Sequence, residues 1–106
     1  MGRRRLSFTA FSVLYAIANG FRYGFDIMES TGLASGTVYP VLSRLERDGL
    51  VGSAWEDEQQ ATDEGRPARR YYEVTGKGAE ALQEAVTMLN GIAGDRLAIP
   101  DTRGGR

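Results

Sequence analysis

One amphipathic helix, expected over residues 36–48, most constrains how this chain can fold. Its apolar side chains recur at the i, i+3, i+4 and i+7 spacing, as Val38, Val41, Leu42 and Leu45. Ser35 is predicted to cap the first turn, and Gly49 ends the helix in a conformation that glycine favours. The helix therefore buries one face in a core and leaves the opposite face open to solvent or to a partner.

The segments before this helix predict a helix-turn-helix arrangement. A short helix is expected over residues 23–30, and residues 31–34 form a turn that contains Gly32. Further upstream, residues 7–19 predict a longer helix that Gly20 ends. Its apolar band is wide and comprises Phe8, Ala10, Phe11, Leu14, Tyr15, Ile17 and Ala18. Two interpretations remain open: this helix is covered by its own domain and by a partner subunit, or it is the central helix of one small core.

The second half of the chain predicts a wing and one more helix. Strands are expected over residues 50–55 and 71–74, joined by a polar loop over residues 56–70. Thr75 is predicted to cap a last helix over residues 78–93. The apolar stripe of that helix is Ala79, Leu82, Val86, Leu89 and Ala93. The fold class is therefore mainly α with a two-stranded β-wing (α+β), a winged helix-turn-helix.

The length of 106 residues allows a single domain with one core. We divide it into a winged helix-turn-helix domain over residues 1–75, a last helix over residues 76–93 and a flexible tail over residues 94–106. No apolar run approaches the roughly 20 residues that span a bilayer, so we expect no membrane segment. The N-terminus also lacks the pattern of a secretory signal, and we expect a cytoplasmic protein.

The chain contains no cysteine and no histidine, which narrows the chemistry available to it. Without cysteine there are no disulfides, thiolate nucleophiles or cysteine-based metal sites. Without histidine the chain lacks the commonest general base and the commonest transition-metal ligand. We therefore expect no catalytic residue, no metal site and no cofactor, and an enzyme is the weaker class of function.

The net charge of −1 does not by itself indicate nucleic-acid binding, but the charges are unevenly distributed. Residues 1–55 carry six arginines against four acidic residues, and residues 56–65 carry five acidic residues and no basic one. Arg66, Arg69 and Arg70 then follow within five positions. A near-neutral total can therefore hide a basic face.

The outer face of the helix over residues 36–48 supplies candidate DNA contacts, namely Thr37, Tyr39, Ser43 and Arg44. Hydroxyl and guanidinium groups bind base edges and phosphates, and small residues allow a helix to enter the major groove closely. The alternative is an ordinary solvated face, with Tyr39 as a half-buried packing residue.

Three further basic segments are candidate phosphate contacts. Arginines at a hairpin tip can straddle phosphates or enter a narrow minor groove, as Arg66, Arg69 and Arg70 would from the wing. The alternative is a solvated loop whose arginines pair with the acidic residues of the same loop. The basic arm over residues 3–5 and Lys77, near the start of the last helix, are weaker candidates.

Three stretches of the sequence carry a resemblance to a known family. The first is YGFDI over residues 23–27, the second is SGTVYPVLSRLERDGLV over residues 35–51, and the third is GRPARRYYEVT over residues 65–75, followed by Gly78. Together they resemble the PadR family of transcriptional regulators. The resemblance covers about residues 7–90, and the second stretch is its most distinctive part.

The resemblance implies a repressor that binds double-stranded DNA as a homodimer on a pseudo-palindromic operator, with its two recognition helices about one DNA turn apart. It also implies that the last helix packs against the partner's first helix. The side chains expected in this dimer interface are Phe8, Phe11, Leu82, Val86 and Leu89. A small hydrophobic effector at that interface is a further expectation. Some small members bind flat aromatic effectors there with a tryptophan of the last helix, but here the single tryptophan, Trp55, lies in a wing strand and is expected in the core.

A second class of function remains open. The winged helix could bind another protein through the acidic loop over residues 56–65, without binding DNA. The near-neutral net charge favours this alternative, and the arginines of the wing and of the helix over residues 36–48 oppose it. Strong salt dependence of DNA binding would separate the two functions.

Overall fold

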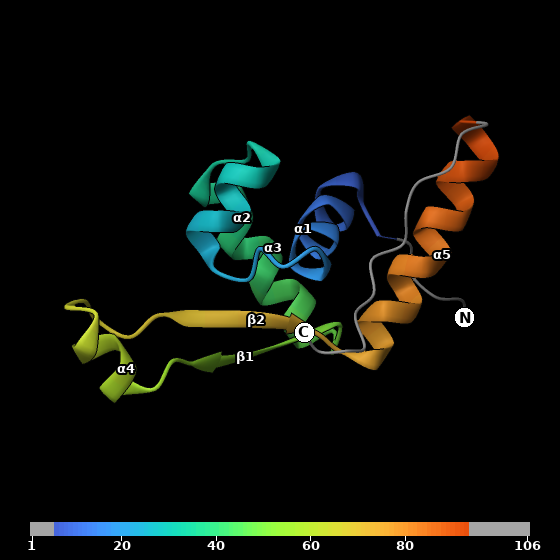
Figure 1. The fold of residues 1–106 in the computed structure, drawn as a ribbon. Coiled ribbons are helices and arrows are strands. Elements are labelled where there is room, and N and C mark those ends of the chain that lie inside the picture. Colours follow the sequence, from blue (N-terminus) through green and yellow to red (C-terminus); the bar gives the residue numbers. More distant parts are fainter. Residues whose placement is uncertain (1–5, 94–106) are drawn as a thin grey trace.

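The fold places a two-stranded wing on one side of a helical core and a long helix on the other (Figure 1). The computed structural model describes residues 6–93, so the predicted arm over residues 3–5 and the predicted tail over residues 94–106 lie outside the described residues. The elements are α1 (Phe8–Ala18), α2 (Gly24–Thr31), α3 (Ser35–Arg47), β1 (Val51–Trp55), α4 (Glu58–Asp63), β2 (Arg70–Val74) and α5 (Gly76–Ala93). The predicted fold class, mainly helical with a two-stranded hairpin, is confirmed. None of the helices in the described range is long and apolar enough to cross a membrane.

Caps and glycines explain where the first two helices begin and end. The Ser7 hydroxyl accepts a hydrogen bond from the backbone N–H of Ala10 at 3.0 Å, which caps α1. The chain then turns at Gly20, with φ of 100°, and leaves α2 at Gly32, with φ of 78°. These left-handed conformations favour glycine. The predicted end of α1 at Gly20 is confirmed, and α2 runs one residue beyond its predicted end at position 30.

The prediction that Ser35 caps the third helix was wrong. Ala34 occupies the cap position with an extended backbone and no side-chain hydrogen bond, and its carbonyl accepts from the N–H of Val38 at 2.9 Å. Ser35 is therefore already the first residue of α3. The turn after α2 is one residue shorter than the sequence pattern indicated.

The wing is an antiparallel hairpin that leads away from the end of α3. Its register runs from Val51 opposite Val74 to Trp55 opposite Arg70. Residues opposite each other in such a pair lie on the same face of the hairpin. One face of the wing therefore carries the side chains of both Trp55 and Arg70.

The segment predicted as a polar loop contains α4, a helix of six residues, so that prediction was incomplete. The Asp57 carboxylate accepts a hydrogen bond from the backbone N–H of Gln59 at 2.9 Å and caps this helix. Ala61 is its buried residue. A helix this short carries no apolar periodicity that a sequence pattern could reveal.

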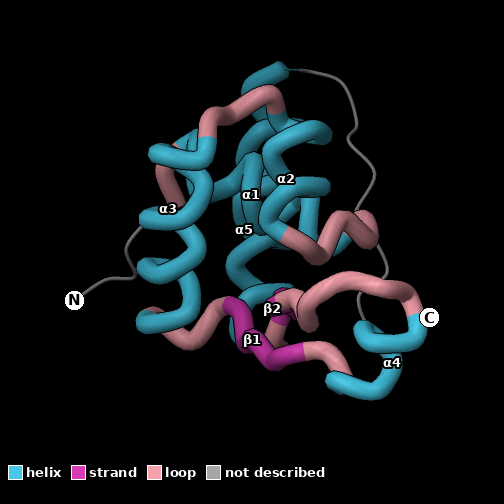
Figure 2. Tube along the Cα trace, turned by 90° about the vertical axis from the view of Figure 1, so that its left-hand side faces the viewer, coloured by secondary structure: helices cyan, strands magenta, loops and turns pink. Residues whose placement is uncertain are grey.

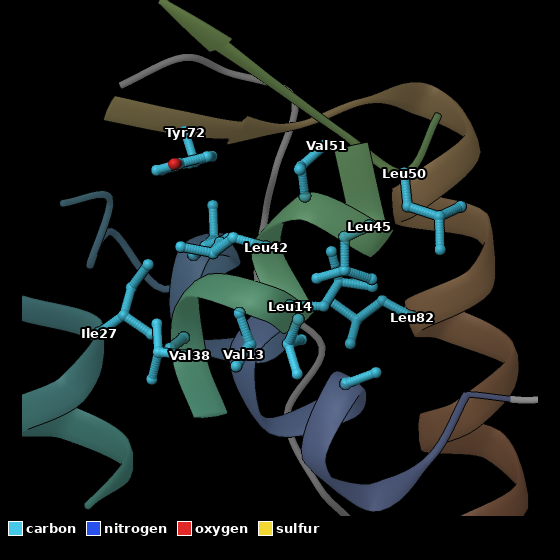
Figure 3. Packing of buried hydrophobic residues seen from close by; sticks show 14 residues of the cluster. Val13, Leu14, Ile27, Val38, Leu42, Leu45, Leu50, Val51, Tyr72 and Leu82 are labelled. Atoms are coloured by element: carbon cyan, nitrogen blue, oxygen red, sulfur yellow. The ribbon is translucent and has the colours of Figure 1, made fainter. Parts of the chain in front are cut away.

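The core lies where α1, α2, α3, the root of the wing and α5 meet (Figure 3). Its labelled members are Val13, Leu14, Ile27, Val38, Leu42, Leu45, Leu50, Val51, Tyr72 and Leu82. The apolar face predicted for α3 is confirmed, because all four of its residues are buried. The opposite face of α3 is consequently turned outwards.

The aromatic side chains of α1 lie outside this core. Phe8 is 77% exposed, and Phe11 and Tyr15 are partly buried, with their rings stacked at a centroid distance of 5.4 Å. The core face of α1 is formed by Ala10, Val13, Leu14, Ala16 and Ile17. The helix therefore has an apolar face that its own core does not fully cover.

Leu82 and Val86, expected in the dimer interface, are 1% and 0% exposed in the protomer. Their part in a dimer stays a prediction. The expectation that Trp55 lies in the core was wrong: it is 63% exposed, because it stands at the end of β1 farthest from the helical core.

α5 begins at Gly76, two residues earlier than predicted. The predicted cap at Thr75 is confirmed, since its hydroxyl accepts a hydrogen bond from the N–H of Gly78 at 3.0 Å. The same hydroxyl donates to the carbonyl of Gly49 at 2.7 Å. The end of α3 and the start of α5 are thereby fixed to each other.

Candidate nucleic-acid interface

The outer face of α3 is exposed along the helix, at the edge of the molecule that Figure 2 shows on its left. Thr37, Tyr39, Ser43 and Arg44 are all exposed, as predicted for residues that meet a partner. No residue in the described part of the chain forms an ion pair with Arg44. Its guanidinium group therefore keeps its donors for an external acceptor.

Tyr39 also packs against the start of α2. Its ring and hydroxyl occupy the space that a Cβ atom at position 24 would need, so the contact requires Gly24. Tyr39 is nevertheless 47% exposed. Both roles considered for this residue, half-buried packing and surface contact, are compatible with its position.

The tip of the wing is organised around one buried carboxylate, that of Glu56. It accepts hydrogen bonds from the hydroxyl of Tyr23 at 2.8 Å and from the backbone N–H of Arg69 at 2.9 Å. The two Nη atoms of Arg66 donate to it at 2.6 and 3.2 Å. We call Tyr23, Glu56, Arg66 and Arg69 the wing latch, because the cluster ties the wing tip to the residue that precedes α2.

The wing latch shifts the pKa values of its members. Hydrogen bonds from Arg66 hold the pKa of Glu56 well below its ordinary value of 4.5, against the opposing effect of burial. The hydrogen bond to Glu56 raises the pKa of Tyr23, since it stabilises the protonated phenol. The carboxylate is therefore ionised at neutral pH, and the latch contributes stability above about pH 4.5 that is lost as the pH falls through the lowered pKa.

Replacing Glu56 with glutamine should open the wing tip while leaving the helical core intact. The neutral amide cannot form an ion pair with Arg66. Its NH2 group would also face the groups of Tyr23, Arg66 and Arg69 that donate hydrogen bonds to Glu56. We expect the backbone amide of Arg69, which donates to Glu56, to exchange its hydrogen about tenfold faster. Hydrogen exchange measured at neutral pH and at successively lower pH tests this, because the difference between the variant and the wild type should begin to shrink below about pH 4.5 and disappear only as the pH falls through the lowered pKa of Glu56.

Glu58→Gln is the matched control, since it removes another carboxylate of the same segment at an exposed position. Exchange at Arg69 should stay unchanged in this variant. Equal protection of Arg69 in the wild type and in Glu56→Gln would show that the latch does not hold the wing tip.

Two of the predicted wing contacts belong to this latch. Arg66 binds both Glu56 and Glu64, the latter at 2.8 Å, and its side chain is only 24% exposed. Arg69 is 46% exposed, and its guanidinium carbon lies 3.9 Å from the centre of the Tyr23 ring. Arg69 is therefore more accessible to an external ligand than Arg66.

The third predicted wing contact, Arg70, links the wing to α3. Its Nε and Nη2 atoms donate to the hydroxyl of Ser53 at 3.0 and 2.8 Å, and Nη2 lies 3.4 Å from the carboxylate of Glu46. Ser53 in turn donates to Glu46 at 2.7 Å. This face of the wing is consequently held against the last turns of α3.

Lys77 has a structural role in the protomer. Its Nζ atom donates to the backbone carbonyl of Asp48 at 3.0 Å, directly after the end of α3. Sequence reasoning did not single out Arg47, which is exposed on the same helix one turn after Arg44. The i, i+3 spacing of two arginines was the available signal.

One known protein family matches most of the chain. Residues 13–84 match a family described as the transcriptional regulator PadR-like family. None of the curated proteins matches the chain.

Solved structures share the fold. A PadR family transcription regulator from Clostridium difficile has a TM-score of 0.72 and 23% identity, over 81% of this chain and 91% of that chain. A PadR-like transcription factor from Bacteroides fragilis has a TM-score of 0.66 and 27% identity, over 78% of this chain and 81% of that chain. BpsR of Bordetella bronchiseptica, whose DNA binding is regulated by 6-hydroxynicotinic acid, has a TM-score of 0.70 and 20% identity, over 89% of this chain and 67% of that chain.

Proposed function

The chain belongs to the PadR-like family of transcriptional regulators, and from this we propose that it is a sequence-specific DNA-binding repressor that works as a homodimer. The observation that carries the proposal is the exposed outer face of α3, opposite a fully buried apolar face. The major groove of B-DNA admits one α-helix and presents a distinct donor and acceptor pattern for each base pair. Thr37, Ser43 and Arg44 offer the hydroxyl and guanidinium groups that read this pattern or bind the phosphates beside it.

The wing supplies the second part of the proposed interface. Arg69 and Arg70 keep about half of their side chains exposed, at 46% and 43%, and are the wing residues we expect to reach phosphates. Arg66 and Lys77 contribute less, because each already serves an internal contact. The acidic helix α4 lies at the end of the wing far from α3, so it need not meet the DNA that α3 contacts (Figures 1 and 2).

Dimerisation is proposed through the outer side of α1 and the last turns of α5. Phe8 and Phe11 offer apolar surface on α1, and Leu89 is only partly buried on α5. A large exposed aromatic side chain at a helix surface is typical of a protein interface. Two such protomers would present two α3 helices about one DNA turn apart, as a pseudo-palindromic operator requires.

We propose further that a small hydrophobic effector acts at this dimer interface and releases the DNA, because Phe8 on α1 and Met88 on α5 expose apolar surface. A complex with the effector bound on the wing instead would contradict this. We propose no catalytic activity for this protein. We propose that it acts in the cytoplasm, where its operator would lie.

DNA binding by the purified protein is expected to be strong only at low salt. The test is fluorescence anisotropy with labelled DNA from upstream of its own gene, against scrambled DNA, over a salt series. A dimer that contacts six or more phosphates should lose about 10³-fold in affinity between 50 and 200 mM salt. The mass of the complex should correspond to two protomers for each duplex.

Absence of DNA binding even at low salt would overturn the proposal and favour a winged helix that binds another protein. The near-neutral net charge and the acidic α4 are the observations behind that second candidate. A pull-down from cell extract would then replace the search for an operator.

A further inference from the structure

The only tryptophan of the chain, Trp55, is an exposed aromatic side chain that the proposed contacts leave unused. It is 63% exposed at the outer end of β1. Tyrosine and tryptophan that contribute to a core bury most of their ring, and Trp55 does not. Most of its ring is therefore accessible to an external ligand.

The register of the hairpin places Trp55 on the face of the wing that turns towards α3. Trp55 lies opposite Arg70, and Ser53, two residues back on the same face, is opposite Tyr72. Ser53 donates to Glu46 of α3 at 2.7 Å, and Tyr72 is buried in the core beside α3 (Figure 3). Trp55 thus continues this face beyond the part that α3 and the core cover.

Arg70 is held beside Trp55, and one nitrogen of its guanidinium group is open to a further acceptor. Its guanidinium carbon lies 5.9 Å from the centre of the Trp55 ring and 6.0 Å from that of Tyr72. Nε and Nη2 are engaged by Ser53 and Glu46, whereas Nη1 makes no hydrogen bond to any residue within the described range. The group is positioned by the protein, and its outer edge is open to an acceptor.

We propose that Trp55 and Arg70 together bind the sugar–phosphate backbone of DNA next to the groove that α3 enters. Arg70 binds a phosphate through Nη1, and the Trp55 ring packs on the neighbouring deoxyribose. This inference rests on the proposed DNA-binding function and assigns Trp55 to the same interface. The choice of DNA follows from charge: the ring stands beside a cation, and Arg44 and Arg47 extend the positive charge along α3.

Trp55 and Arg70 would contribute two different kinds of interaction with DNA, which an ordinary basic patch does not. Arg70 supplies charge, and its binding to phosphate depends on salt. Trp55 supplies apolar contact area with little loss of side-chain freedom, and its contribution does not depend on salt. The two residues should therefore respond differently to the same salt series.

The single tryptophan makes the experiment specific, because intrinsic fluorescence reports on Trp55 alone. The full-length protein is titrated with the labelled duplex, and tryptophan emission and DNA anisotropy are followed in the same samples. We expect the emission to change and to saturate at the same DNA concentration as the anisotropy. The two signals then report one binding event.

Substitutions separate the two contributions. Trp55→Ala should weaken binding about tenfold, through the loss of the apolar area that the ring buries against the sugar, and leave the salt slope unchanged. Trp55→Phe should recover most of the affinity. Arg70→Ala should weaken binding and lower the salt slope by about one for each subunit. Circular dichroism checks that the variants fold.

Each other outcome overturns the inference. If the DNA binds but Trp55 emission and the affinity of Trp55→Ala stay unchanged, the wing pair is not a contact, although the proposed function stands. If emission changes on dilution without DNA, Trp55 lies between subunits instead. If no DNA binds at any salt concentration, the proposed function fails, and this contact fails with it.

Discussion

Replacing Arg44 with alanine should weaken operator binding about 100-fold while leaving the protein folded. The side chain is exposed on α3, no described residue pairs with it, and alanine favours a helix, so the free energy of unfolding should hardly change. A guanidinium contact to a guanine or a phosphate contributes about 1–3 kcal/mol, and a dimer loses two of them at once. Anisotropy at fixed salt measures the loss.

The salt series shows what Arg44 binds. If it contacts phosphate, the slope of log affinity against log salt should fall by about two for the dimer. If it reads a base, the slope should stay and the preference over scrambled DNA should shrink. Unchanged affinity in the Arg44→Ala variant would show that this side of α3 does not contact DNA and would contradict the proposed binding mode.

Gln83→Glu is the matched control for Arg44→Ala. Both substitutions lower the net charge by one unit, and Gln83 is exposed on α5. Long-range electrostatics alone is screened within about 8 Å at physiological salt, so this variant should bind within about twofold of the wild type. A loss as large as that of Arg44→Ala would show that total charge, and not the α3 contact, governs binding.

The wing arginines should matter less than Arg44, for an electrostatic reason. Arg66, Arg69 and Arg70 each lie within 3.4 Å of a carboxylate of the protein. Binding a phosphate there exchanges one ionic partner for another, so the net gain is smaller than at an unpaired guanidinium. The same pairing explains how a chain with a net charge of −1 can still present an exposed arginine on α3, Arg44, that no described carboxylate pairs with.

Periodicity predicted the parts of the fold in which burial decides the structure. The buried face of α3, the end of α1 at Gly20 and the Thr75 cap all follow from local residue chemistry, and the structure confirms them. A helix that buries one face must turn the other outwards. The exposure of Thr37, Ser43 and Arg44 could therefore be predicted as well.

The features that the sequence did not predict depend on partners distant in the chain. Glu56 pairs with Tyr23, 33 residues away, and nothing local distinguishes it from the other acidic residues of its segment. Trp55 was misplaced because its burial depends on which element packs opposite, and periodicity does not state that. α4 escaped notice because its stability comes from the Asp57 cap and one buried residue.

The largest expected effect on stability comes from adding one methyl group at Gly78. A Cβ atom there would collide with the backbone carbonyl of Leu50 and press on the side chain of Val74. That carbonyl also accepts the N–H of Thr75 at 3.1 Å, so moving it disturbs the start of α5. Gly78→Ala should therefore lower the free energy of unfolding by about 2 kcal/mol, although alanine would otherwise favour the helix by about 1 kcal/mol.

Urea unfolding at a fixed protein concentration measures this change, since a dimer's stability depends on concentration. Gly76→Ala is the matched control: the same substitution lies in the first turn of α5, with no atom within 4 Å of the added Cβ. It should leave the free energy of unfolding equal or slightly higher. If Gly78→Ala proves as stable as Gly76→Ala, α5 does not pack against Leu50 as closely as described, and the joint between α3, the wing and α5 is not rigid. If the two variants differ as expected, one contact at Gly78 holds α5 to the end of α3, and the orientation of the proposed dimerisation helix is coupled to that of the helix proposed to read DNA.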